Sequence, residues 1–248
     1  MMRLLVVLLL IAFGAHAQSS SVPPPGPSAF TAQQRREIVD ILRQALRTDP
    51  TILRDAVTAL QNDESERQDG AARAVIASQR EELLRIQGDP VAGNVNGDVT
   101  VVEFYDIRCP YCRRMLPVVA ELLKRDRNVR IVYKDIPILG PASVIGARAL
   151  LAAHRQGGYF KLRDALMTGG QIDADTIKAT ALRLGLDAER LQRDMTDAAI
   201  QARIDANLKL AHVLTIQGTP AYIIGDQFLP GAIDITDLQK MIALARRK

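Results

Sequence analysis

The sequence predicts an α/β domain that carries a helical insertion and is preceded by a helical arm. Three observations lead to this fold class. A strand, a helix and a strand are predicted at 99–105, 110–124 and 129–135, which is the spacing of a βαβ unit with parallel pairing. Residues 141–214 consist almost entirely of amphipathic helical segments. The segment 220–232 then reads as a hairpin and is followed by a last helix.

The first 29 residues precede every predicted core element. One basic residue is followed by an unbroken apolar run from Leu4 to Phe13, and a small-residue A-x-A pattern ends at Ala17. This pattern predicts a cleaved secretory signal peptide at 1–17, because the run is about half as long as the roughly 20 residues of a membrane span. The Pro- and Ser-rich residues 18–29 are predicted to be a linker. We therefore expect the mature protein outside the cytoplasm, where disulfides persist.

Residues 30–87 are predicted to form an arm of amphipathic helices. Apolar residues recur at helical spacing within 38–46 and within 52–60, and Pro50 marks the restart between them. A third helix is predicted over 65–87, with a short seam of coiled-coil spacing. Helices this short bury little apolar surface alone. The arm is therefore expected either to pack on its own domain or to associate with other copies into a dimer or trimer, and the sequence leaves both interpretations open.

Residues 88–248 are predicted to form the main domain. The strands at 99–105 and 129–135 are β-branched and apolar, which is typical of buried parallel strands. The hairpin at 220–232 has its turn at Gly225 and Asp226.

The charge of the chain argues against nucleic acid as a partner. There are 32 Lys and Arg residues against 28 Asp and Glu residues, and the formal net charge is +4. No segment concentrates basic residues densely enough to match a phosphate backbone, so we expect no nucleic-acid partner.

Cys109 and Cys112, within the letters CPYC, are the only cysteines of the chain. Haem attachment requires a histidine after the second cysteine, where Arg113 stands instead. A zinc site needs four ligands, and beyond the predicted signal peptide the chain offers these thiols and two helical histidines. A structural disulfide at this spacing would close too small a loop to stabilise much. Redox exchange remains as the main interpretation, and Cu(I) binding by the two thiolates remains as an alternative.

The position of the first cysteine favours a reactive thiolate. Cys109 follows a predicted strand and precedes a predicted helix, so its sulfur is expected at a helix N-terminus, where unpaired N–H groups stabilise negative charge. Pro110 suits the first helical turn. Arg108, Arg113 and Arg114 are expected to add positive potential. We therefore predict Cys109 as the nucleophile and Cys112 as the resolving thiol.

Two further features fit a redox site. Glu103 interrupts the apolar strand VVEFY, and a buried carboxyl six residues before Cys109 is expected below the thiols with a raised pKa, able to carry protons to or from Cys112. Lys134 is a possible partner for Glu103.

The segment QGTPAYII places Pro220 at the start of a strand, and a cis bond after Thr219 would expose backbone to an extended client peptide.

These residues resemble the DsbA-like branch of the thioredoxin superfamily. The matching segments are VVEFYDIRCPYC, YKDIPILG and GTPAYIIG, in that order around the helical insertion, and the likeness runs from about residue 88 to the C-terminus. The resemblance implies a thioredoxin fold in which Cys109 is the nucleophile, Cys112 resolves, Glu103 lies below the site and Pro220 is cis beside the sulfurs. Thr219, Tyr111 and Pro110 would contact the client.

The arm together with CPYC is similar to periplasmic ScsC-type proteins (suppressor of copper sensitivity). This likeness implies a periplasmic disulfide oxidase or isomerase that needs no cofactor beyond the Cys109–Cys112 disulfide. Its partners would be cysteine-containing client proteins and a membrane reductase or oxidant. Tyr111 stands where DsbA itself has histidine, and Thr219 resembles the isomerase-type members, so the direction of exchange stays open. A copper-binding or chaperone-like protein is the alternative function.

Overall fold

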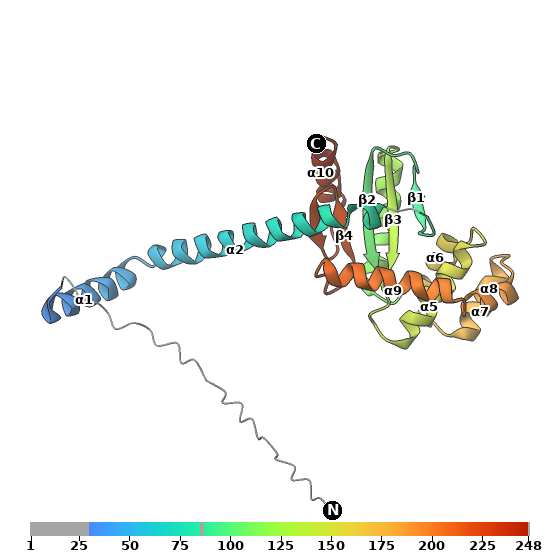
Figure 1. Ribbon diagram of the computed structural model, residues 1–248, viewed down its shortest axis with the longest axis horizontal. Helices are drawn as coiled ribbons and strands as arrows, with labels where there is room; N and C mark the ends of the chain where they lie inside the picture. The colour runs from blue at the N-terminus through green and yellow to red at the C-terminus, as the bar shows by residue number, and fades with distance from the viewer. Residues whose placement is uncertain (1–29, 85–86, 248) are drawn as a thin grey trace, which may run out of the picture. The chain divides into compact units, whose positions relative to one another are not determined.

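The computed structural model describes residues 30–84 and 87–247 (Figure 1). The chain divides into two compact units, residues 1–60 and residues 61–248. The predicted signal peptide, 1–17, and linker, 18–29, lie outside the described residues.

The described part of the first unit is helical. α1 (Ala32–Thr48) begins with a capping box, in which Thr31 and Gln34 each accept a hydrogen bond from the backbone N–H of the other. α2 (Thr51–Ser78) begins directly after Pro50, as the sequence predicts. No residue within α1 is buried, so its apolar stripe has no cover inside this unit.

The second and third predicted helices differ from the observed ones. α2 continues without interruption through the polar residues 61–70, where the sequence suggested two separate helices. It ends at Ser78, and the short α3 (Arg80–Leu84) follows. The segment lacks an apolar stripe, and the good helix formers Glu64, Glu66 and Arg67 alternate there with poorer ones.

A five-stranded sheet forms the centre of the second unit, in the order β1-β3-β2-β4-β5. β2 (Val99–Tyr105) and β3 (Val129–Asp135) are parallel, which confirms the predicted βαβ unit. β4 (Ala221–Ile224) and β5 (Gln227–Pro230) form the predicted hairpin. β1 (Val91–Gly93), which the sequence did not predict, pairs antiparallel with β3.

Helices cover both faces of the sheet. α4 (Pro110–Arg125) and α10 (Ile235–Arg246) contribute to one apolar cluster with the side chains of one face. The end of α2, α3 and α9 (Ala198–Val213) contribute to a second cluster on the opposite face. Because β2 is buried on both faces, the end of this strand is held firmly where the cysteines follow.

The insertion consists of α5 (Pro141–His154), α6 (Tyr159–Gly169), α7 (Ala174–Arg183), α8 (Ala188–Asp194) and α9 (Figure 1). It occupies 141–213, close to the predicted 141–214. α5 to α8 and the first half of α9 join the same apolar cluster as α4, whereas the second half of α9 joins the cluster on the opposite face of the sheet.

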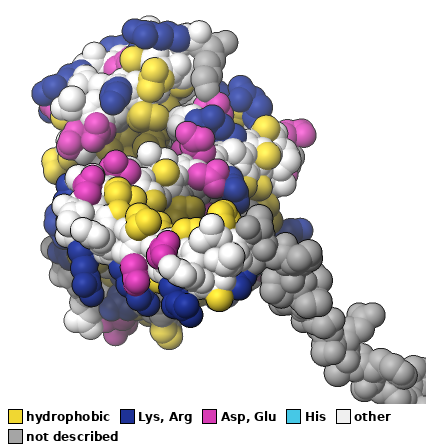
Figure 2. All heavy atoms as spheres, turned by 90° about the vertical axis from the view of Figure 1, so that its left-hand side faces the viewer, with side chains coloured by type: hydrophobic (Ala, Val, Ile, Leu, Met, Phe, Trp, Pro, Cys, Tyr) yellow, Lys and Arg dark blue, Asp and Glu magenta, His cyan; other side chains and the backbone are white. Residues whose placement is uncertain are grey.

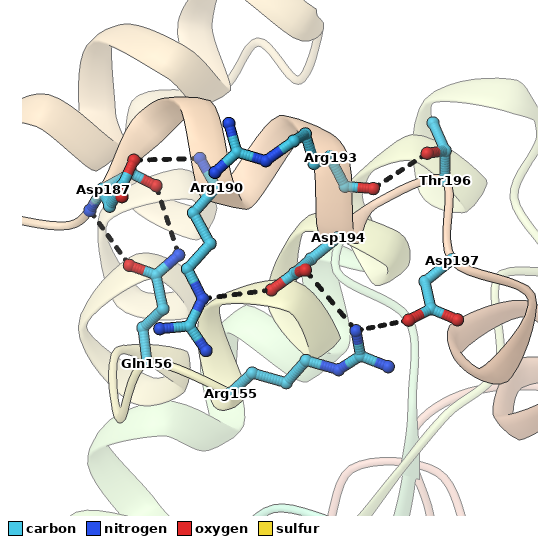
Figure 3. Close-up of polar contacts among 8 residues, drawn as sticks. All are labelled: Arg155, Gln156, Asp187, Arg190, Arg193, Asp194, Thr196 and Asp197. Atoms are coloured by element: carbon cyan, nitrogen blue, oxygen red, sulfur yellow. Dashed lines mark hydrogen bonds and ion pairs between the residues drawn. The ribbon is translucent and has the colours of Figure 1, made fainter.

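Polar contacts hold the end of α5 to α8 and to the start of α9 (Figure 3). Arg155 Nη1 lies 2.6 Å from Asp197 Oδ2 and 3.6 Å from Asp194 Oδ1. Gln156 accepts from the backbone N–H of Asp187 at 2.9 Å and donates to its carbonyl at 3.2 Å. These contacts join the helices of the insertion to one another.

The ion pair of Lys134 and Asp89 is buried, with side-chain exposures of 1% and 0%. Lys134 Nζ also donates to the carbonyl of Glu82 at 2.9 Å, and Arg203 Nη1 lies 3.5 Å from the other carboxylate oxygen of Asp89. This cluster links β3 to α3 and α9, on the face of the sheet that these two helices cover.

The surface carries both signs of charge. On the face shown in Figure 2, Lys and Arg side chains are interspersed with Asp and Glu. Among the described residues no helix is both long and apolar enough to cross a membrane.

Removing one partner of the buried pair tests its contribution. Lys134→Ala is expected to lower the free energy of unfolding by about 3–5 kcal/mol, because it leaves the Asp89 carboxylate buried with Arg203, 3.5 Å from one of its oxygens, as its remaining cation. Lys124→Ala, which removes an exposed amine 4.0 Å from Glu121, is the control, with an expected change within about 0.5 kcal/mol. Urea unfolding followed by circular dichroism measures both, and equal losses would contradict this account.

Candidate active site

Asp106 organises the loop between β2 and α4. Its carboxylate, 1% exposed, accepts from the backbone N–H groups of Arg108, Ile138 and Leu139 at 2.8, 2.8 and 3.0 Å, and from the Ser143 hydroxyl at 2.8 Å. These bonds tie the loop before the cysteines to the loop after β3. Asp106 is not among the residues predicted from the sequence, although a carboxylate directly after a buried strand is a usable signal.

Cys109 occupies the N-cap position of α4, and Pro110 is the first helical residue. The cysteine N–H donates to the Asp106 carbonyl at 3.0 Å, which closes the turn into the helix. Both cysteines are free thiols, with exposures of 5% for Cys109 and 2% for Cys112. The sulfur of Cys109 therefore lies at the helix N-terminus, where the sequence places it.

Hydrogen bonds lower the pKa of Cys109 to about 5. The largest contribution is the hydrogen bond from the Cys112 thiol, and the Thr219 side chain and the backbone N–H groups of Cys112 and Tyr111 add to it against the opposing effect of burial. As a thiol, Cys109 donates to the backbone carbonyl of Thr219, with Sγ 3.1 Å from the oxygen. A group with this pKa is ionised at neutral pH.

The second thiol has the opposite character. Burial raises the pKa of Cys112 far above its ordinary value, and the bond that it donates to Cys109 and the negative charge of Glu103 act in the same direction. The two sulfurs are thus electrostatically unequal: one is held as an anion and the other as a proton donor.

Glu103 lies on β2, is 4% exposed, and interacts electrostatically with Cys112. Burial raises its pKa to about 7, although the positive charge of Arg163 and a hydrogen bond from Tyr222 oppose the shift. Oε1 accepts from the Tyr222 hydroxyl at 3.2 Å, and Oε2 has no hydrogen-bond partner among the described residues. A carboxyl with this pKa exchanges its proton near neutrality.

The suggested pairing of Glu103 with Lys134 is wrong. Glu103 is in register with Tyr133, so Lys134 points to the opposite face of the sheet, where it binds Asp89. Side-chain alternation along β3 separates the two.

Arg163 and Tyr222 are the neighbours of Glu103 that sequence reasoning missed. Arg163 is 8% exposed, and its guanidinium carbon lies 5.0 Å from the Tyr133 ring centroid. Tyr222 follows Pro220 by two residues and pairs with Glu103 across β2 and β4. An arginine on α6 gives no local signal in the sequence.

The Thr219–Pro220 peptide bond is cis. Thr219 lies beside Cys109 through the contact of its carbonyl with Sγ, and Pro220 is buried. Tyr111, between the cysteines, is 51% exposed, and the Arg114 guanidinium carbon lies 4.3 Å from its ring centroid. The residues singled out from the sequence therefore come from three separate segments of the chain and converge at the N-terminus of α4.

Residues 100–243 match the model of the DsbA-like thioredoxin domain. The chain belongs to the DsbA-like thioredoxin family. Members of this family are thiol:disulfide oxidoreductases. The match includes β2, the cysteines, the insertion and the cis-proline hairpin, so the family's fold and the observed fold agree over this range.

Solved structures of similar proteins support this assignment. A thioredoxin-like oxidoreductase from Silicibacter pomeroyi is 42% identical, with a TM-score of 0.65, over 68% of this chain and 98% of that one. ScsC from Proteus mirabilis, in a transitional conformation, is 27% identical, with a TM-score of 0.65, over 88% of this chain and 99% of that one. The match to ScsC therefore extends into the helical arm.

A curated relative shows the domain in another setting. The Na⁺/H⁺ antiporter NhaA 1 of Salinispora arenicola is 31% identical over 160 residues, which is 63% of this chain and 24% of the antiporter. The chain thus spans about a quarter of the length of such relatives.

The buried carboxyl of Glu103 makes stability depend on pH. Because its folded-state pKa is raised from 4.5 to about 7, its contribution is fully present below pH 4.5 and is lost as pH rises toward 7. Glu103→Gln removes this loss, so its stability relative to wild type is expected to rise by about 3 kcal/mol between pH 4.5 and pH 8.

Urea unfolding of the reduced proteins at several pH values measures this difference. The control is Glu121→Gln on α4, whose carboxyl has a pKa lowered by its hydrogen bond with Arg125 and so gives no such rise above pH 5. A constant difference for Glu103→Gln across the range would show that the carboxyl titrates normally.

Proposed function

We propose that this protein is a periplasmic thiol:disulfide oxidoreductase that exchanges disulfides with client proteins through Cys109 and Cys112. The observation that carries the proposal is the inequality of the two thiols, because hydrogen bonds lower the pKa of Cys109 to about 5 while burial raises that of Cys112. Exchange requires one thiolate that attacks and a second thiol that is held back until a mixed disulfide has formed.

In the reducing direction, the Cys109 thiolate attacks one sulfur of a client disulfide. A bond forms between Cys109 and that sulfur, and the other client sulfur leaves as a thiolate and takes a proton. Cys112 then loses its proton and attacks Cys109, which releases the second client thiolate and leaves the Cys109–Cys112 disulfide. Two electrons pass from the protein to the client. Oxidation of a client dithiol is the reverse sequence.

Glu103 is suited to accept the Cys112 proton. The carboxyl interacts with Cys112 and has an oxygen without a hydrogen-bond partner among the described residues. Its pKa of about 7 lets it take up and release a proton at neutral pH, whereas an ordinary carboxyl would stay ionised. Tyr222 and Arg163 hold that pKa in range by opposing the effect of burial.

Thr219, Pro220, Tyr111 and Pro110 are suited to contact the client. The Thr219 carbonyl lies 3.1 Å from the Cys109 sulfur, where an extended client segment can pair with this stretch of backbone. Tyr111 and Pro110 are exposed next to the sulfur and offer apolar contact.

The predicted signal peptide supports the proposed periplasmic setting, as does the likeness to a periplasmic thioredoxin-like protein of Salmonella enterica, which is 28% identical. A protein that donates disulfides needs a membrane oxidant, and one that reduces or isomerises them needs a membrane reductase. Either partner would act on the Cys109–Cys112 pair without a further cofactor.

Single-cysteine variants test the proposal. Wild type is expected to accelerate insulin reduction by dithiothreitol and to reactivate scrambled ribonuclease, and Cys109→Ser should reduce both to the uncatalysed rate. Cys112→Ser should also lose turnover but accumulate a mixed disulfide with the client, seen by mass spectrometry. A wild type inactive in both assays would indicate a binding protein, and mixed disulfides on Cys109→Ser would reverse the assigned roles.

We also propose that the arm joins copies of this chain into a dimer or trimer. α1 and the start of α2 expose eight large apolar side chains at helical spacing, and this stripe has no cover within its own unit: Ile38, Ile41, Leu42, Leu46, Ile52, Leu53, Val57 and Leu60. A stripe of this kind in a soluble protein marks a contact surface. A second copy offers the same stripe.

Light scattering on the protein from residue 18 onward is expected to give a dimer or trimer. Ile41→Glu with Leu42→Glu should yield monomers, because a carboxylate in an apolar seam is costly. Gln44→Glu, an exposed polar position on the same helix, is the control and should leave the assembly intact. A monomeric wild type at micromolar concentration would refute this role of the arm.

A further inference from the structure

The surface around Cys109 combines exposed apolar side chains with three arginines. Tyr111, Ile138 and Leu139 are 51%, 42% and 42% exposed. Asp106 binds the backbone N–H groups of both Ile138 and Leu139 as well as that of Arg108, so these residues are fixed beside the cysteine. We name this surface the active-site rim, and its residues are Arg108, Tyr111, Arg113, Arg114, Ile138 and Leu139.

The three arginines of the active-site rim are exposed and form no ion pair with any acidic residue in the described ranges 30–84 and 87–247. Arg108 Nη1 donates to the Leu139 carbonyl at 2.8 Å, and Arg114 stacks on Tyr111. The nearby carboxylate of Asp106 is buried and accepts only from backbone N–H groups and a hydroxyl. The rim therefore presents uncompensated positive charge to a docking molecule.

This charge has no evident task inside the protein. The leading causes of the lowered Cys109 pKa are hydrogen bonds from Cys112, Thr219 and backbone N–H groups, and no arginine is among them. We expected from the sequence that these arginines would stabilise the thiolate, but none of them is among the main causes of the lowered Cys109 pKa. Cations that are fixed by a carbonyl contact and by ring stacking, yet lack an anion, are suited to bind one from outside.

We propose that the active-site rim selects client segments in which an acidic residue lies next to the reactive cysteine. The inference rests on the proposed function, since it names the substrate class of the same site. A client cysteine at the Cys109 sulfur brings its neighbouring residue over the rim, where the arginines bind a carboxylate and Tyr111, Ile138 and Leu139 contact apolar atoms. Such pairs lie at an exposed surface, so each contributes modestly and salt weakens it.

Three peptide disulfides test this selection. Each consists of two copies of one peptide joined through its cysteine, and the three peptides differ only in the residue before that cysteine, which is Asp, Asn or Lys. Reduced protein converts each disulfide into two peptide thiols and itself becomes the Cys109–Cys112 disulfide, and acid-quenched chromatography follows the reaction. Each rate is divided by the rate of the same peptide with dithiothreitol, because a neighbouring charge also changes the peptide thiol's own reactivity.

The variant that removes the charge of the active-site rim combines Arg108→Gln, Arg113→Gln and Arg114→Gln. Arg127→Gln, an exposed arginine beyond the far end of α4, is the control.

For wild type we expect the normalised rate to fall from Asp to Asn to Lys, with about a tenfold span at low ionic strength and about a twofold span in 0.5 M salt. The triple variant should show the smaller span at both salt concentrations, and Arg127→Gln should match wild type. Equal normalised rates for the three peptides, or an unchanged span in the triple variant, would overturn the selection but leave the proposed function standing. Failure to react with any peptide would instead overturn the proposed function.

Discussion

The set of hydrogen bonds that converges on the Cys109 sulfur is the interaction on which the rest of the site depends. The Cys112 thiol, the Thr219 side chain and the backbone N–H groups of Tyr111 and Cys112 each make a hydrogen bond that lowers the pKa of this sulfur. They come from two segments of the chain: the CPYC motif, which begins α4 at Pro110, and Thr219, which lies just before β4. The sheet, buried on both faces, holds these segments together, and Asp106 secures the loop between them.

The face of the sheet beneath the cysteines supplies the complementary chemistry. Desolvation keeps Cys112 protonated and brings the pKa of Glu103 to about 7, so that this acid is only partly ionised at neutral pH, and Tyr222 and Arg163 limit the effect on the acid. The result is a thiolate at Cys109, which is 5% exposed, close to two groups that hold protons in the core, Cys112 and Glu103. A disulfide exchanger needs this arrangement, because its two sulfurs must exchange roles during one cycle.

Local patterns predicted much of this fold, and long-range contacts account for what they missed. β2, β3, the hairpin and the helix start at Pro110 follow from strand composition and turn residues, so the sequence located them. β1 has only three residues and no alternation to detect, and α2 crosses a polar segment that carries no apolar stripe. The contacts of Glu103 with Tyr222 and Arg163 join residues distant in the chain, and only the strand register excludes Lys134.

The measurement that tests this account most directly is titration of the Cys109 thiolate in the reduced protein by its ultraviolet absorbance. The chain has no Trp and five Tyr residues, whose ordinary pKa near 10 keeps their ionisation away from the relevant range. The account predicts one thiolate that ionises near pH 5 and is lost in Cys109→Ser. A first ionisation near pH 8.5, the value of an ordinary cysteine, would contradict it.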